Sequence, residues 1–143
     1  MRTQPSAELG ALHCRCAAGQ TEPPVLIVED DDETARCLGE FLAGAGYSSC
    51  RAANGLAALH HVRMHGKPSV ILLDLHLPVM DGDEVVRVLQ REPEWRRIPV
   101  VLVTADPQAK DRAIAMHCSG YLKKPIAHHD LLTMVDSALR FPT

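Results

Sequence analysis

Short apolar runs alternate along the chain with longer segments in which apolar residues recur every three or four positions. Runs of four or five apolar residues bounded by turn residues are typical of strands buried on both faces, and the longer spacing is typical of amphipathic helices. Three runs are unbroken, at Val25–Val28, Val70–Leu73 and Pro99–Val103, and two more polar stretches, Tyr47–Ala52 and Ser119–Leu122, complete the predicted strands. The polar character of Tyr47–Ala52 predicts an edge strand.

Helix signals separate the predicted strands. Asp31 or Asp32 is expected to cap the first helix and Asn54 the second, and Asp106-Pro107 is expected to open a short fourth helix. Strand and helix therefore alternate five times. This alternation predicts an α/β fold: a doubly wound, five-stranded parallel sheet with helices on both faces, which is a three-layer sandwich.

The length of 143 residues suits one domain with a real core. Residues 1–24 combine proline and glycine with small and polar residues, so we expect a mobile N-terminal tail followed by a folded domain at 25–140. The chain ends at Thr143, directly after the last predicted helix, so a domain that acts alone is expected.

Composition excludes several classes of function. A net charge of −3 gives no electrostatic reason to expect nucleic acid as a partner. The sequence has neither an apolar run of membrane-spanning length nor a signal peptide, so we expect a cytoplasmic protein without membrane insertion. The five cysteines form no CxxC pair and do not indicate a disulfide framework or a zinc site. His61 and His65 are expected to lie on a solvated helix face.

Carboxylates follow two of the predicted buried strands. Glu29 and Asp30 come after the first apolar run and Asp74 ends the central one, so they converge where parallel strands end. Like charges that close repel unless a cation lies among them, and an all-oxygen site suits Mg²⁺. Thr104 and Lys124 follow two other strands and would neutralise an anion beside the metal. The set predicts a phosphoryl-transfer site with a carboxylate nucleophile and an aspartyl phosphate product.

Four short motifs occur in a characteristic order: Glu29-Asp30 after the first strand, Asp74 with Pro78 and Asp81-Gly82, Thr104-Ala105, and Tyr121 three residues before Lys124-Pro125. In this order and spacing the sequence resembles the response-regulator receiver domain of two-component signalling, over roughly residues 25–140. The resemblance implies a flavodoxin-like fold with strand order 2-1-3-4-5.

The resemblance assigns the acidic residues. It implies that Asp74 is the phosphoacceptor and that Mg²⁺ is the cofactor. Asp30 and Asp74 would bind the metal directly, the backbone carbonyl of His76 would be the third protein ligand, and Glu29 would help through water.

The resemblance also assigns the residues around the phosphoryl group. Lys124 would pair with it, the backbone N–H of Ala105 would bind it, and the Thr104 hydroxyl would hydrogen-bond it. Thr104 and Tyr121 would form the switch that reports phosphorylation. The Lys124-Pro125 bond is typically cis in the family.

Positions near the pocket mouth and the fourth helix distinguish this chain. The side chains of His76 and Asp106 would border the path of attacking water and tune the rate of phosphate loss. The span from Thr104 to Lys124 is slightly short for the family, so the fourth helix is expected to lose part of a turn. His117 stands where the family often has a helix-ending glycine.

The function implied is that of a stand-alone receiver, a switch rather than an enzyme, with self-dephosphorylation as its only turnover. A histidine kinase or histidine phosphotransfer protein would phosphorylate Asp74. The signal would pass onward in a phosphorelay, or to a protein partner through the face of helix 4, strand 5 and helix 5. One alternative is a Mg²⁺-dependent phosphatase with an Asp nucleophile, although His76 stands where such enzymes carry a second Asp. The other is an interaction module that works without phosphorylation.

Overall fold

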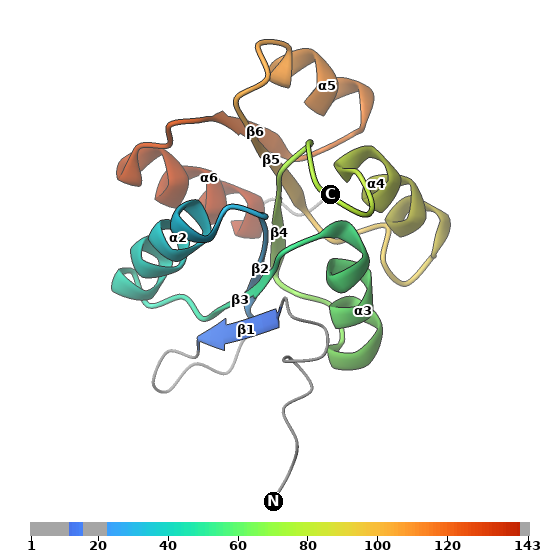
Figure 1. The fold of residues 1–143 in the computed structure, drawn as a ribbon, viewed down its shortest axis with the longest axis horizontal. Coiled ribbons are helices and arrows are strands. Elements are labelled where there is room, and N and C mark those ends of the chain that lie inside the picture. The colour runs from blue at the N-terminus through green and yellow to red at the C-terminus, as the bar shows by residue number, and fades with distance from the viewer. Residues whose placement is uncertain (1–11, 16–22, 141–143) are drawn as a thin grey trace, which may run out of the picture.

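The computed structural model describes residues 12–15 and 23–140 (Figure 1). Five parallel strands form the body of the sheet: β2 (Val25–Val28), β3 (Ser49–Ala52), β4 (Val70–Leu73), β5 (Val100–Thr104) and β6 (Gly120–Lys123). Their order is β3-β2-β4-β5-β6. This confirms the predicted order 2-1-3-4-5.

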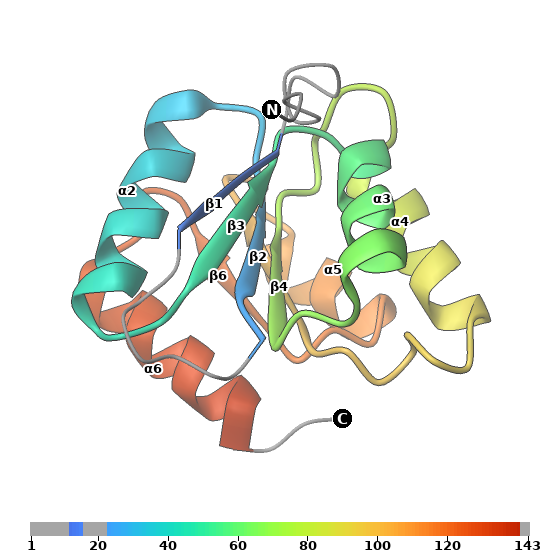
Figure 2. The same ribbon diagram turned by 90° about the horizontal axis from the view of Figure 1, so that it is seen from below.

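Helices cover both faces of the sheet (Figure 2). Helices α2 (Asp32–Gly44) and α6 (His128–Arg140) lie on one face, and α3 (Gly55–His65), α4 (Gly82–Arg91) and α5 (Ala109–Ala115) lie on the other. The predicted three-layer sandwich is therefore correct. Helix α5 has seven residues, about two full turns, and it starts two residues after Pro107 rather than at Asp106-Pro107 as predicted.

Two predicted capping residues satisfy the free N–H groups that begin the helices. The Asp31 carboxylate accepts from the Thr34 N–H at 2.9 Å, and the Asn54 side chain accepts from the Ala57 N–H at 2.7 Å. Such caps stabilise a helix by about 1 kcal/mol each. They also fix the point where the chain leaves a strand end, which is where the predicted site residues lie.

The core consists of two apolar layers, one on each face of the sheet. Within β2, Leu26 and Val28 join the layer under α3 and α4, whereas Val25 and Ile27 join the layer under α2 and α6. This alternation follows from the two-residue period of a strand. It explains why the central strands are apolar at every position, as the sequence pattern indicated.

An additional strand corrects the prediction for the N-terminal segment. Leu12–Arg15 forms β1 and pairs antiparallel with β3, with Leu12 opposite Ala52 and Cys14 opposite Cys50. The predicted edge strand is therefore internal, because β1 occupies its free backbone groups. Cys50 is disulfide-bonded, which the cysteine count did not indicate. The rest of the predicted tail, residues 1–11 and 16–22, lies outside the described residues.

His61 is buried, and the prediction of a solvated face is wrong at this position. Its side chain is 2 % exposed, whereas His65, one turn later, is exposed. His61 therefore belongs to the buried part of α3, together with Ala58 and Val62. Within the described part of the chain, every helix is too short or too polar to cross a bilayer.

Candidate functional site

Three carboxylates meet at the carboxyl ends of β2 and β4. The two strands are in register, with Val28 opposite Leu73, so the acids that follow them are neighbours. Ligand oxygens of Glu29, Asp30 and Asp74 lie within 4.8 Å of one another. Glu29 and Asp74 are buried and Asp30 is exposed.

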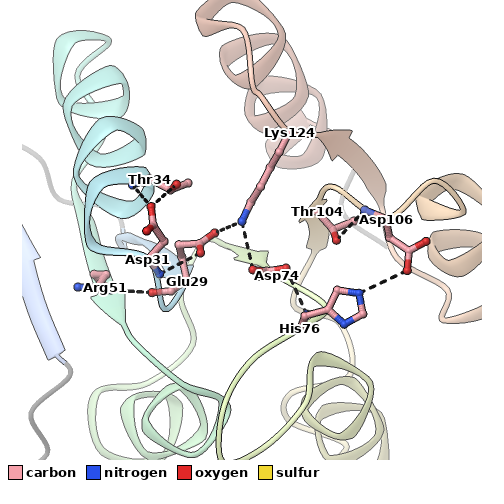
Figure 3. A network of polar contacts seen from close by, with 9 residues as sticks. All are labelled: Glu29, Asp31, Thr34, Arg51, Asp74, His76, Thr104, Asp106 and Lys124. Atoms are coloured by element: carbon pink, nitrogen blue, oxygen red, sulfur yellow. Dashed lines mark hydrogen bonds and ion pairs between the residues drawn. The ribbon is translucent and has the colours of Figure 1, made fainter.

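Lys124 links two of these acids (Figure 3). Its Nζ lies 2.7 Å from Glu29 Oε1 and 3.2 Å from Asp74 Oδ2. The cis Lys124-Pro125 bond follows β6, and the Lys124 N–H donates to the Thr104 carbonyl at 3.0 Å. Burial lowers the pKa of the Lys124 ammonium, but the two carboxylates outweigh burial and raise it overall. The lysine is therefore a cation at neutral pH.

The buried Glu29 carboxyl has only part of its hydrogen-bonding capacity filled by the described residues. Burial raises its pKa, although Lys124 and the Asp31 N–H act in the opposite direction. Its Oε2 accepts from that N–H at 3.1 Å. Its Oε1 makes the ion pair with Lys124 but no aligned hydrogen bond within the described residues. An under-satisfied buried oxygen beside two further carboxylates fits a hard cation such as Mg²⁺.

A second group of polar residues lies on the other side of Asp74 (Figure 3). Thr104 is fully buried, and its Oγ1 accepts from the Asp106 N–H at 3.2 Å. His76 Nε2 lies 3.4 Å from Asp106 Oδ2, and the His76 N–H donates to Asp74 Oδ1 at 3.2 Å. The Gln108 N–H lowers the pKa of Asp106, with His76 contributing less. The structure thus brings the predicted acids, Thr104 and Lys124 together, with His76 and Asp106 at the mouth.

Comparison with known proteins identifies the family. The sequence matches the response regulator receiver domain over residues 25–136. The chain belongs to this family. Receiver domains act as signalling switches in two-component systems rather than as ordinary enzymes, and they bind Mg²⁺ at their acidic cluster.

Curated relatives include the polar-differentiation response regulator DivK. The chain is 36% identical to DivK of Brucella anthropi over 117 residues, which covers 80% of this chain and 94% of the relative. The Brucella ovis protein is 35% identical over the same length and the same shares of both chains.

Solved receiver structures share the fold. The chemotaxis response regulator CheY4 of Vibrio cholerae is 29% identical, with a TM-score of 0.76 over 83% of this chain and 100% of that chain. The receiver domain of sensor histidine kinase PA1611 from Pseudomonas aeruginosa is 25% identical, with a TM-score of 0.77 over 85% of this chain and 100% of that chain. That structure has a magnesium ion coordinated in its active-site cleft.

The remaining predicted residues lie at the edge of this receiver site. Ala105 is exposed and directly follows Thr104. Tyr121 lies in β6 opposite Leu102, and its half-buried ring packs against the apolar layer under α3 and α4. The ring is therefore next to the last strand that contributes to the site.

Arg51 belongs to the site and was not predicted. It lies in β3, and its guanidinium donates to the Glu29 carbonyl and to the Asp32 carboxylate. The available signal was a charged residue in a strand of otherwise small residues, one position before the end of that strand. The sequence alone did not show its partner, because the partner is a backbone carbonyl.

Proposed function

We propose that this receiver is phosphorylated on Asp74, with Mg²⁺ as cofactor, by a histidine kinase or a histidine phosphotransfer protein. One observation carries the proposal. The Asp74 side chain is 8% exposed and lies between a lysine ammonium and two further acids that follow the neighbouring strand β2. A nucleophilic carboxylate needs such a dry, charge-compensated position to attack a phosphoryl group.

The acids divide into a nucleophile and metal ligands. Asp30, Asp74 and the His76 backbone carbonyl would hold Mg²⁺, with Glu29 helping through water. When bound, the metal neutralises charge on the phosphoryl oxygens. An oxygen of Asp74 attacks the phosphorus of the donor, the new P–O bond forms as the donor's P–N bond breaks, and the donor imidazole leaves with the electron pair.

Lys124, Thr104 and Ala105 would receive the phosphoryl oxygens. Lys124 already contacts Asp74 and would move its ion pair to the new anion. The Thr104 oxygen accepts from the Asp106 N–H, so its hydroxyl hydrogen remains available to donate. The Ala105 backbone N–H lies in the same segment and would provide a further donor.

A groove beside the site supports a protein as the phosphodonor. It has a volume of about 520 Å³, lies next to Lys124, and is lined by apolar side chains that include Leu38, Phe41 and Ile126. An apolar groove of this kind suits a partner that presents its phosphohistidine to Asp74.

Output would pass through the face formed by α5, β6 and α6. Thr104 ends β5 and Tyr121 lies in the neighbouring β6, so a movement of the threonine toward a phosphoryl group would reach the tyrosine ring. Ile114 on α5 is 64 % exposed and gives this face an apolar contact for a downstream partner.

The His76–Asp106 contact would tune the lifetime of the phosphorylated state. The two side chains come from different loops and meet at 3.4 Å at the pocket mouth. An attacking water would pass between them, so they would either obstruct the water and slow hydrolysis, or orient the water and speed it.

The test is phosphorylation by a small donor. Acetyl phosphate with Mg²⁺ should add one phosphoryl mass to the wild-type protein and none to Asp74→Asn. Asp111→Asn, which changes an exposed acid on α5, serves as the control and should behave like the wild type. A phosphoryl adduct that survives in Asp74→Asn would contradict the assignment.

A further inference from the structure

We propose that Arg51 is a positioning residue, which orients the loop that carries Glu29 and Asp30 for metal binding. The proposal rests on the proposed function and adds a residue from outside the loop. Arg51 lies 22 residues from Glu29 in sequence and reaches it from β3. It would act through the backbone that carries the metal ligands rather than by touching the metal.

The contacts of Arg51 are specific. Its Nε and Nη2 both donate to the Glu29 carbonyl, at 3.0 Å and 2.8 Å, and its Nη1 donates to Asp32 Oδ1 at 2.8 Å. The Arg51 side chain is only 16% exposed, so it is held in place along its length. The planar guanidinium directs its donors in fixed directions, which a lysine ammonium does not.

The Glu29 carbonyl lies where the β2–β3 ladder ends. The Glu29 N–H donates to the Ala52 carbonyl at 3.0 Å, which is the last ladder bond between β2 and β3 on this side. Beyond Ala52 the β3 chain turns into the cap of α3, so β3 offers no backbone donor to the Glu29 carbonyl. The Arg51 guanidinium supplies that donor instead.

This contact orients Asp30. The Ala52 carbonyl holds the peptide unit before Glu29, and the Arg51 guanidinium holds the carbonyl of the peptide unit between Glu29 and Asp30. Because that peptide is planar, a fixed carbonyl also fixes the direction in which the Asp30 backbone continues. The carboxylate of Asp30 then remains near Glu29 and Asp74, where the ligand oxygens of the three acids lie within 4.8 Å of one another.

The Asp32 contact is secondary. The Asp32 side chain is 93% exposed, and ion pairs to such groups contribute little in water. The positioning effect is therefore assigned to the two bonds with the Glu29 carbonyl. This distinction provides a matched control, since Asp32→Ala removes the ion pair and leaves both carbonyl bonds in place.

The expected result is weaker metal binding. Loss of a group that orients a metal ligand typically costs about 10- to 100-fold in affinity, so Arg51→Met should raise the Mg²⁺ dissociation constant by that factor. Arg51→Lys retains the charge without the paired donors and should recover only part of the loss. Asp32→Ala should stay close to the wild type.

Phosphorylation kinetics provide a second readout. A positioning role predicts that Arg51→Met needs more Mg²⁺ for half-maximal phosphorylation by acetyl phosphate, while the rate at saturating Mg²⁺ stays near the wild-type rate. A general loss of folded protein would instead lower the rate at every Mg²⁺ concentration.

The experiment is calorimetric titration of wild type, Arg51→Met, Arg51→Lys and Asp32→Ala with MgCl₂, after circular dichroism has shown each to be folded. Wild-type affinity in both Arg51 variants overturns the proposal. Full recovery in Arg51→Lys also overturns it, because charge alone would then suffice. If Arg51→Met does not fold, Arg51→Lys decides the question. Failure of the wild type itself to bind Mg²⁺ would contradict the proposed function instead.

Discussion

The site around Glu29, Asp74 and Lys124, called here the strand-end pocket, contains a buried ionisable residue, and so does helix α3. Glu29 in the pocket and His61 in α3 are each 2 % exposed. Each also has one buried atom without a hydrogen bond in the described part of the chain, Oε1 of Glu29 and Nδ1 of His61. The pocket provides Glu29 with a cation, because Lys124 lies 2.7 Å away. Helix α3 provides His61 with none: burial first, then His65 and His60, lower its pKa to about 4.

The difference separates a site from a packed residue. A buried group without a counter-charge becomes neutral and can be retained for its shape alone. A buried cluster of two acids whose charge is balanced by a lysine adds little stability to the fold. Such a cluster is therefore more typical of a functional site than of a packed core. Glu29 and His61 are equally buried, but Glu29 belongs to a charged site and His61 is a neutral residue of the packed interior.

The two groups also respond to pH with opposite sign. His61 binds fewer protons in the folded than in the unfolded protein between pH 4 and 6.5, so its contribution to stability is lost as the pH falls through that range. Glu29 has a raised pKa and binds more protons when folded, so stability falls as the pH rises above its ordinary value. Lys124 limits that second loss.

The largest expected effect comes from removing the counter-charge. Lys124→Met leaves Glu29 and Asp74 buried without their cation, and should lower the free energy of unfolding of the metal-free protein at pH 7 by about 3 kcal/mol. Urea denaturation in EDTA measures it. Lys123→Met, which changes the exposed neighbour, is the control and should have little effect. Equal stabilities of the two variants would show that Lys124 does not compensate the acids.

Stability at acid pH tests whether His61 is buried in its neutral form. Protonation of His61 should cost the wild type roughly 3 kcal/mol on going from pH 6.5 to pH 4, from a pKa lowered to about 4. His61→Leu should lack this component, so the difference between the two stability curves should change over that range. His129→Leu alters an exposed histidine of α6 and should follow the wild type. A constant difference for His61→Leu would mean that His61 is not buried neutral.

Mg²⁺ should stabilise the pocket and leave α3 unaffected. At a metal concentration about 100 times the dissociation constant, the wild type should gain about 2.7 kcal/mol. Asp30→Ala should gain much less at that concentration, while its metal-free form is at least as stable because repulsion is relieved. Glu33→Ala, an exposed acid in the first turn of α2, should show the wild-type gain. The same gain in Asp30→Ala would remove Asp30 from the metal site.

The smallest effect concerns backbone rather than charge. His117 follows α5 with a φ of 59°, a left-handed conformation that glycine adopts without cost. His117→Gly should raise the free energy of unfolding by about 0.5 to 1 kcal/mol, net of the greater freedom of glycine in the unfolded chain. Ala115→Gly, inside the same helix, should instead lower it. Thermal unfolding of both variants measures the difference, and a destabilised His117→Gly would contradict the strain.

Local pattern was enough to predict which side chains meet at the strand ends. Glu29, Asp74 and Thr104 each follow an apolar run, and parallel strands end at a common edge, so their convergence followed from the order of the elements. The resemblance to receivers placed His117 where the family often has a helix-ending glycine, and His117 has a φ of 59°. These features depend on short stretches of sequence.

Contacts between distant segments could not be predicted in the same way. Strand β1 is defined by its pairing with β3, and four residues of mixed polarity do not specify a partner. His61 is buried whereas His60 and His65 of the same helix are not, so its burial depends on what packs over α3 and not on the residue types within it. Arg51 binds a backbone carbonyl, which has no identity in the sequence.

The central claim is that the compensated carboxylate at the end of β4 accepts the phosphoryl group. The most direct measurement is reduction of the acetyl phosphate-treated wild type with sodium borohydride, followed by peptide sequencing by mass spectrometry. An aspartyl phosphate is an acyl phosphate and is reduced to homoserine, whereas a phosphohistidine is not. Homoserine at position 74, dependent on Mg²⁺, is the result expected. Homoserine at position 30 or at another acid, with Asp74 intact, would contradict the account.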